Sequence, residues 1–77
     1  MMENKIFKVI SDVLDVPLEN VNKSSSPDDF ESWDSLKQMN LIIALEESFE
    51  IQFSDEQIIT MLNVELIIIA VKELIDN

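Results

Sequence analysis

The 77-residue sequence contains no cysteine, no histidine and no glycine. Without cysteine the chain can form neither a disulfide nor a thiolate metal site. Without histidine it lacks the usual general base and the commonest zinc ligand, so we expect no metal centre. The absence of glycine excludes a calcium-binding EF-hand loop. It also argues against a β-rich fold, which would need many tight turns with positive φ. Helices joined by polar loops are favoured instead.

Positive charge is scarce. Five lysines and no arginine stand against 16 aspartates and glutamates, giving a net charge of −11. Nucleic-acid phosphates and anionic membrane surfaces are bound by basic side chains, so we expect no nucleic-acid partner and no binding to anionic membranes. An acidic surface fits partners with basic surfaces, although such a surface can equally be solvated and unpartnered.

Long hydrophobic runs are also missing. The N-terminal sequence MMENKIFKVI does not have the pattern of a signal peptide, and the longest apolar run, Leu66–Val71, is too short to cross a bilayer. We therefore expect a cytoplasmic protein without membrane insertion. Apolar residues still make up 47% of the chain, which is enough for one core. The length predicts a single domain over residues 1–77, and we expect it to be a monomer.

The first part of the chain predicts an amphipathic helix followed by a long loop. Apolar residues recur at helical spacing over Glu3–Val16. Pro17 should end this helix, because a proline pushes the residue before it out of the α region. The loop Leu18–Asp34 contains the sequence SSSPDDF, which suits the start of a short helical turn. We expect this turn, which follows Ser26, to direct Phe30 into the core.

The second part of the chain predicts three more helices. The sequence SDEQ is a capping box that begins at Ser54, and Asn63 can cap the last helix. The predicted helices are Ser35–Glu50, Asp55–Met61 and Val64–Ile75, with an extended IQF segment between the first two. The expected fold is all-α: a small four-helix bundle with three main helices, one short third helix and a long loop between helices one and two.

The helix predicted over Ser35–Glu50 carries two apolar stripes on nearly opposite sides. One stripe should face the core and consists of Leu41, Ile42, Leu45 and Phe49. The other consists of Leu36, Met39 and Ile43, and Glu46 and Glu47 lie beside it. Either another segment covers this second stripe, or it is exposed as an apolar strip with a rim of carboxylates, which is typical of a protein-binding surface. We favour the exposed strip.

Ser35 lies where the loop becomes this helix, in the sequence ESWDSLKQMN. A serine hydroxyl is a weak nucleophile without an adjacent base; histidine is absent, and Lys37 lies on a different part of the helix surface. Ser35 is therefore better interpreted as an acceptor that another enzyme modifies. A phosphodiester there would be stabilised by the free N–H groups and the dipole of the helix N-terminus.

The stretch WDSLKQMNLIIALEESFEIQFSDEQI resembles the acyl carrier protein family. That family attaches 4′-phosphopantetheine, taken from coenzyme A, to the serine of an Asp-Ser-Leu motif, which here matches Asp34, Ser35 and Leu36. The resemblance implies a carrier rather than an enzyme, holding acyl groups as thioesters on an imported thiol. Its implied partners are a phosphopantetheinyl transferase and acyl-loading and acyl-transfer enzymes, which would meet Leu36, Met39, Ile43, Glu46 and Glu47.

The resemblance also implies a cleft for the acyl chain between the helices. Its lining would include Phe30, Leu45, Phe49, Phe53, Ile58, Met61, Leu62 and Ile67, although each of these can equally be ordinary core. Two other functions stay open. One is a carrier of aminoacyl or peptidyl groups, which would use the same Ser35. The other is an unmodified acidic adaptor in which Ser35 is only a helix cap.

Several positions depart from the family pattern. Housekeeping fatty-acid carriers typically have carboxylates two and five residues past the serine, where this chain has Lys37 and Asn40. A glycine commonly precedes the motif, but here Trp33 occupies that approach, either packed on the core or exposed to a partner. We interpret these differences as signs of a specialised carrier for modification of a surface polysaccharide, a lipid or a secondary metabolite, although neutral drift would also explain them.

Overall fold

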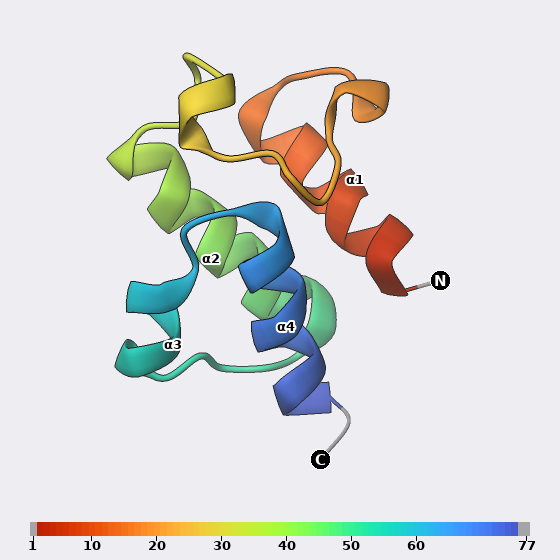
Figure 1. Cartoon of the computed structure of the whole chain (residues 1–77). Helices are drawn as coiled ribbons and strands as arrows, with labels where there is room; N and C mark the ends of the chain where they lie inside the picture. Colours follow the sequence, from red (N-terminus) through yellow and green to blue (C-terminus); the bar gives the residue numbers. More distant parts are fainter. Residues whose placement is uncertain (1, 76–77) are drawn as a thin grey trace.

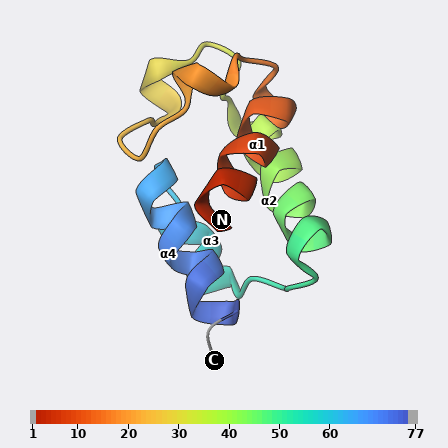
Figure 2. The same cartoon turned by 90° about the vertical axis from the view of Figure 1, so that its right-hand side faces the viewer.

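The computed structural model describes residues 2–75, and within that range every regular element is helical. In Figures 1 and 2, α1 and α2 pack side by side, α4 lies across from them, and the long loop closes the end of the bundle where α2 begins. The all-α bundle with a short third helix is confirmed. The α-helices are α1 (Met2–Leu14), α2 (Ser35–Phe49), α3 (Asp55–Thr60) and α4 (Val64–Ile75), and two 3-10 turns, Leu18–Asn20 and Pro27–Asp29, lie in the loop.

The core forms where the apolar faces of α1, α2 and α4 meet. Its members recur three or four residues apart on each helix, which is the spacing that keeps side chains on one face. Phe30 and Phe49 are partly buried and pack against this cluster. Burial of these side chains supplies the main stabilisation of the fold. The fully buried helical members are Ile6, Ile10, Leu14, Leu41, Leu45, Val64, Ile67 and Val71.

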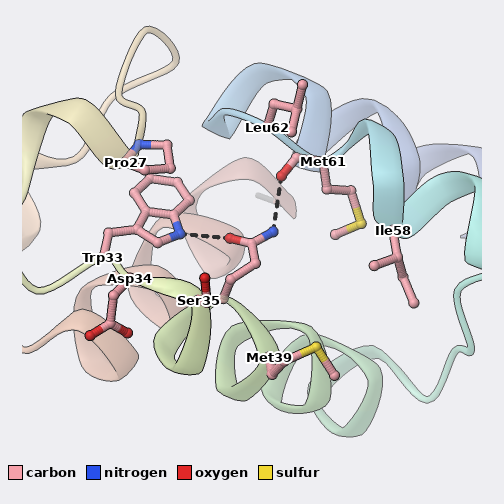
Figure 3. Close-up of a pocket in the computed structure, with 9 residues that line it drawn as sticks. Pro27, Trp33, Asp34, Ser35, Met39, Ile58, Met61 and Leu62 are labelled. Atoms are coloured by element: carbon pink, nitrogen blue, oxygen red, sulfur yellow. Dashed lines mark hydrogen bonds between the residues drawn. The ribbon is translucent and has the colours of Figure 1, made fainter.

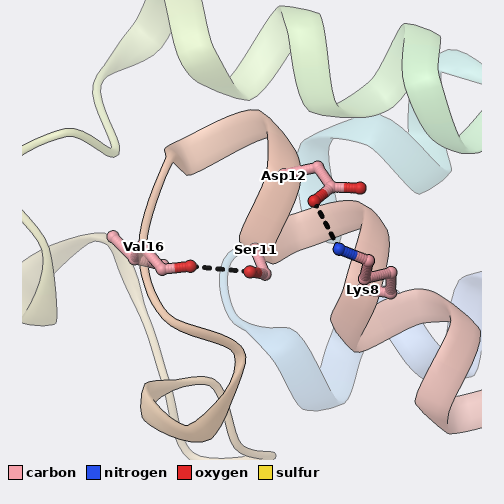
Figure 4. A network of polar contacts seen from close by, with 4 residues as sticks. All are labelled: Lys8, Ser11, Asp12 and Val16. Carbon is pink, nitrogen blue, oxygen red and sulfur yellow. Dashed lines mark hydrogen bonds and ion pairs between the residues drawn. The ribbon is translucent and has the colours of Figure 1, made fainter.

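Helix α1 ends at Leu14, two residues before the predicted end at Val16. Asp15 adopts a left-handed conformation with φ 57°, and the N–H of Val16 donates to the carbonyl of Ser11 at 3.2 Å. This is the closure of a Schellman motif. The Ser11 hydroxyl also donates to the Val16 carbonyl at 2.6 Å (Figure 4). The local hydrogen bonds therefore stop the helix before Pro17 can do so.

Helix α2 ends in the same way, at Phe49 rather than the predicted Glu50. Glu50 has φ 55°, and the N–H of Ile51 donates to the Glu46 carbonyl at 3.1 Å. The short α3 ends at Thr60, one residue before its predicted end, because the N–H of Met61 bonds only three residues back, to Ile58. These differences concern single residues at helix ends.

The predicted starts of α3 and α4 are confirmed by their hydrogen bonds. The N–H of Gln57 donates to the Ser54 hydroxyl at 3.2 Å, and the Ser54 N–H donates to the Gln57 amide oxygen at 3.0 Å. The Asn63 side chain accepts from the N–H of Leu66 at 2.8 Å and so caps α4. In the loop, the Ser26 N–H donates to the Asp29 carboxylate at 2.9 Å, which closes the predicted turn.

The long loop is held against the start of α4. The N–H of Val64 donates to the Ser25 carbonyl at 3.0 Å, and that of Glu65 donates to the Lys23 carbonyl at 3.1 Å. Glu3 on α1 forms ion pairs with Lys23 in the loop at 3.4 Å and with Lys72 on α4 at 3.1 Å. The loop is thereby joined to both helices. No helix in the described range is long and apolar enough to span a bilayer.

Candidate functional site

Ser35 is the first residue of α2, and the cap of this helix is the residue before it. The Asp34 carboxylate accepts from the N–H of Lys37 at 2.9 Å, and the Asp34 carbonyl accepts from the N–H of Gln38 at 2.9 Å. These are the bonds of an N-cap residue. Ser35 is exposed, and none of the hydrogen bonds among residues 2–75 uses its hydroxyl. The capping function considered for Ser35 therefore belongs to Asp34.

Ser35 lies at the positive end of the α2 dipole, next to the Asp34 carboxylate that caps the helix. The first turn of α2 contains no acidic residue and does contain Lys37. A helix N-terminus carries a partial positive charge, so a lysine there is unfavourable unless a negative group is close. The Asp34 carboxylate already supplies such a group, and a phosphate ester on the Ser35 hydroxyl would add a second anion at the N-terminus of α2.

An open pocket of about 490 Å³ lies beside Ser35 (Figure 3). Figure 3 shows Pro27 and the indole of Trp33 on one side of this pocket and Ile58 and Met61 on the other. Ser35 lies at its edge, so a group attached to the hydroxyl could reach the pocket directly. Most of the lining is apolar, and it consists of Pro27, Trp33, Asp34, Ser35, Gln38, Met39, Ile58, Met61 and Leu62.

Trp33 packs into the protein rather than facing a partner. Its side chain is only 4% exposed, and its indole N–H donates to the side-chain oxygen of Gln38 at 2.6 Å. The Gln38 amide nitrogen in turn donates to the Met61 carbonyl at 2.9 Å (dashed lines in Figure 3). We call this Trp33–Gln38–Met61 chain the Gln38 bridge. It joins the long loop, α2 and the end of α3 across the pocket.

Only three of the eight expected cleft residues line this pocket, namely Ile58, Met61 and Leu62. The other five pack in or against the core: Leu45, Phe53 and Ile67 are buried, and Phe30 and Phe49 are partly buried. The sequence analysis missed Gln38 and Met39 as lining residues. They follow Ser35 by three and four positions, and that spacing places them on the same helix face. This signal could have found them.

The two stripes of α2 are both present. Leu41, Ile42 and Leu45 are buried, whereas Leu36, Met39 and Ile43 are 69%, 51% and 50% exposed. We call the second group the outer strip. No described segment covers it, so the alternative in which another part of the chain buries this stripe is wrong.

The two carboxylates of the expected rim differ. Glu47 is exposed, while Glu46 is half-buried and its carboxylate accepts from the backbone N–H of Phe53 at 2.9 Å. Glu46 therefore holds the extended segment after α2 in place, a role that the sequence analysis did not anticipate.

Comparison with known proteins identifies the class. Residues 4–71 match the family model described as "Phosphopantetheine attachment site", so the chain belongs to a class of proteins that bear a prosthetic arm. An acyl carrier protein of Buchnera aphidicola subsp. Schizaphis graminum is 46% identical over 56 residues, which are 71% of this chain and 70% of the relative. One from Buchnera aphidicola subsp. Acyrthosiphon pisum (strain Tuc7) is 44% identical over 57 residues, 73% of this chain and 70% of the relative.

A solved structure agrees. The solution structure of holo acyl carrier protein from Geobacter metallireducens superposes with a TM-score of 0.86 at 26% identity, over 96% of this chain and 85% of that one. The chain belongs to the acyl carrier protein family, which is a family of carriers, and its prosthetic group is 4′-phosphopantetheine.

Proposed function

We propose that the Ser35 hydroxyl carries the 4′-phosphopantetheine arm, and that the chain holds acyl groups as thioesters on the thiol of that arm. The observation that carries this proposal is the free, exposed hydroxyl at the start of α2, released from capping by Asp34 and placed at the edge of the apolar pocket. The phosphodiester would lie at the N-terminus of α2, where the helix dipole favours an anion.

Mass spectrometry tests the attachment residue. Incubation with coenzyme A and a broad-range phosphopantetheinyl transferase should add one prosthetic group to the wild type and none to Ser35→Ala. Ser48→Ala is the matched control, because Ser48 is another exposed serine of α2, and it should be modified like the wild type. Both variants should keep the helical circular dichroism spectrum. Addition of mass to Ser35→Ala would overturn the assignment.

The outer strip is the proposed docking surface for the transferase and for the acyl-loading and acyl-transfer enzymes. It starts at Leu36, directly after the attachment residue, so a partner seated on it would bring its active site to the arm. Exposed apolar side chains with a charged rim are the usual composition of such a surface. Glu47 is free to act as that rim. Glu46 would contribute with its second carboxylate oxygen, because the first is bonded to Phe53.

The pathway served by this carrier is proposed to be a specialised one, such as modification of a surface polysaccharide, a lipid or a secondary metabolite. The support is Lys37, a cation beside the attachment residue, which would repel a basic patch on housekeeping synthases. Turnover by a housekeeping malonyl transferase or ketosynthase should be poor and should improve with Lys37→Asp and Asn40→Glu together. Lys8→Asp on α1, which adds two of the three units of negative charge at a distant exposed site, is the charge control. Housekeeping-level turnover by the unmutated carrier would refute the specialised role.

Aminoacyl or peptidyl cargo is the second candidate and would use the same Ser35. The holo protein can be incubated separately with an acyl-loading enzyme and with an aminoacyl-loading enzyme. The mass added in each case distinguishes the two kinds of cargo. The carrier is proposed to act as a monomer in the cytoplasm. The unmodified adaptor is disfavoured because the cap that it assigned to Ser35 is Asp34. If the wild type gained no mass from coenzyme A and the transferase, the unmodified adaptor would become the favoured function.

A further inference from the structure

We propose that Gln38 determines how deeply cargo can enter the pocket beside Ser35, and thus which acyl groups this carrier shelters. The Gln38 bridge crosses the pocket from Trp33 to the Met61 carbonyl. While it is closed, cargo is confined to the outer part of the pocket. This inference rests on the proposed attachment at Ser35.

The position of Gln38 along α2 makes it a barrier. The inner face of this helix runs from Gln38, which lines the pocket, to Leu41 and Leu45, which are fully buried. These residues are three and four positions apart and share one face. An acyl chain that moves inward along α2 from Ser35 therefore meets the Gln38 side chain before it reaches the apolar core.

Opening the bridge leaves two groups without partners. The Trp33 side chain is 4% exposed and the Met61 residue 1% exposed, so water has little access to the indole N–H or to the carbonyl. Buried polar groups that lose a hydrogen bond are costly. Cargo that pushes Gln38 aside loses these two bonds, whereas cargo in the outer pocket keeps both. A short acyl group, or one with a polar substituent close to the thioester, fits the closed pocket.

The chemistry of the position supports this role. Gln38 is half-buried among apolar lining residues, where an aliphatic side chain would pack without needing partners. Its amide is the group that can accept from the indole and donate to a carbonyl at once. A side chain of similar length without these groups, such as methionine, would leave the same shape but no bridge.

The test compares a butyryl and an octanoyl group. Each is loaded with its phosphopantetheine arm on the Ser35 hydroxyl from butyryl- or octanoyl-coenzyme A by the phosphopantetheinyl transferase, and adenosine 3′,5′-bisphosphate leaves. Urea unfolding then gives the folding equilibrium constant of each loaded form. The two constants should be equal in the wild type. In Gln38→Met the octanoyl form should be the more stable, by about fourfold for each additional methylene group that becomes buried. The asparagine side chain in Gln38→Asn is too short to reach both Trp33 and Met61, so its octanoyl form should also be more stable than its butyryl form.

The fluorescence of Trp33 provides a second readout. Trp33 is the only tryptophan and the chain has no tyrosine, so the emission reports on this pocket alone. In the wild type, the emission of the butyryl and octanoyl forms should coincide, because the indole keeps its hydrogen bond. In Gln38→Met, the emission should change with chain length.

Ser11→Ala is the control for general loss of stability. It removes one part-buried hydrogen bond at the end of α1 (Figure 4). Ser11 does not line the pocket, so the stability of this variant should not depend on the length of the acyl chain. An octanoyl wild type that is more stable than the butyryl form and differs from it in Trp33 emission would overturn the role of Gln38. So would a Gln38→Met variant that loads normally and shows no dependence on chain length. Failure of the wild type to gain mass would instead refute the attachment at Ser35, and the inference with it.

Discussion

Two alanine substitutions on α2, two residues apart, should separate folding from partner recognition. Leu45 is fully buried and Ile43 is 50% exposed. Leu45→Ala should lower the free energy of unfolding by about 2–5 kcal/mol, because it removes core contacts and leaves a cavity. A domain of this length has a total stability of about 4–12 kcal/mol, so this one change removes a large part of it. Ile43→Ala should stay within about 0.5 kcal/mol of the wild type.

The effect on modification should be the reverse. If Ile43 anchors partners on the outer strip, Ile43→Ala should cost about 1 kcal/mol or more of binding, which corresponds to about fivefold in the transferase kcat/KM. Leu45→Ala, assayed under conditions where it is folded, should be modified at the wild-type rate. Urea unfolding and mass spectrometry of the modified protein measure the two quantities. A loss of several kcal/mol in stability for Ile43→Ala would refute its placement on the outside.

Three further predictions concern charge. Glu46→Gln should lower the free energy of unfolding by about 1 kcal/mol in urea, because the bond to the Phe53 N–H weakens, whereas Glu47→Gln at an exposed site should not change it. The pKa of the Glu3 carboxyl is lowered, first by its hydrogen bond to Lys72 and further by Lys23. Its stabilising effect is therefore present above the ordinary carboxyl pKa and is lost as the pH falls through the lowered value. The stability difference between wild type and Glu3→Gln should shrink in acid, and a difference that grows there would contradict this reasoning. Raising the ionic strength from low to moderate should raise the Tm, since a net charge of −11 opposes the compact state, and an unchanged Tm would count against self-repulsion.

The elements of the fold were predictable from the sequence because their signals are local. The side chains of Ser54 and Asn63 each accept a hydrogen bond from a backbone N–H three positions further on. Such capping bonds depend on neighbouring residues and form in most tertiary contexts. The two faces of α2 follow from helical periodicity alone, and the structure buries Leu41 and exposes Leu36 as that periodicity requires. The errors at the ends of α1 and α2 come from Schellman closures without glycine, which leave no signal in the sequence.

The site was predictable only in part, because its walls come from segments that are distant along the chain. Ser35 could be proposed from its motif and its place at the start of a helix. The pocket beside it depends on how the end of α3 lies against α2, and no pattern in the sequence specifies that distance. The indole N–H of Trp33 bonds to Gln38, which is near it in the sequence. Gln38 in turn donates to the Met61 carbonyl, 23 residues further along the chain. That second contact exists only in the folded chain, so the sequence could not indicate the complete bridge.

The left-handed residues Asp15 and Glu50, with φ 57° and 55°, have a consequence for engineering this carrier. A side chain with a Cβ atom costs roughly 1–2 kcal/mol in this conformation, and glycine avoids that cost. The free energy of unfolding is therefore lower than it would be with glycine at these two helix ends. Both positions lie outside the pocket and the outer strip. Glycine at these two positions would give a more robust scaffold, on which harsher substitutions around Ser35 could be studied in a protein that stays folded.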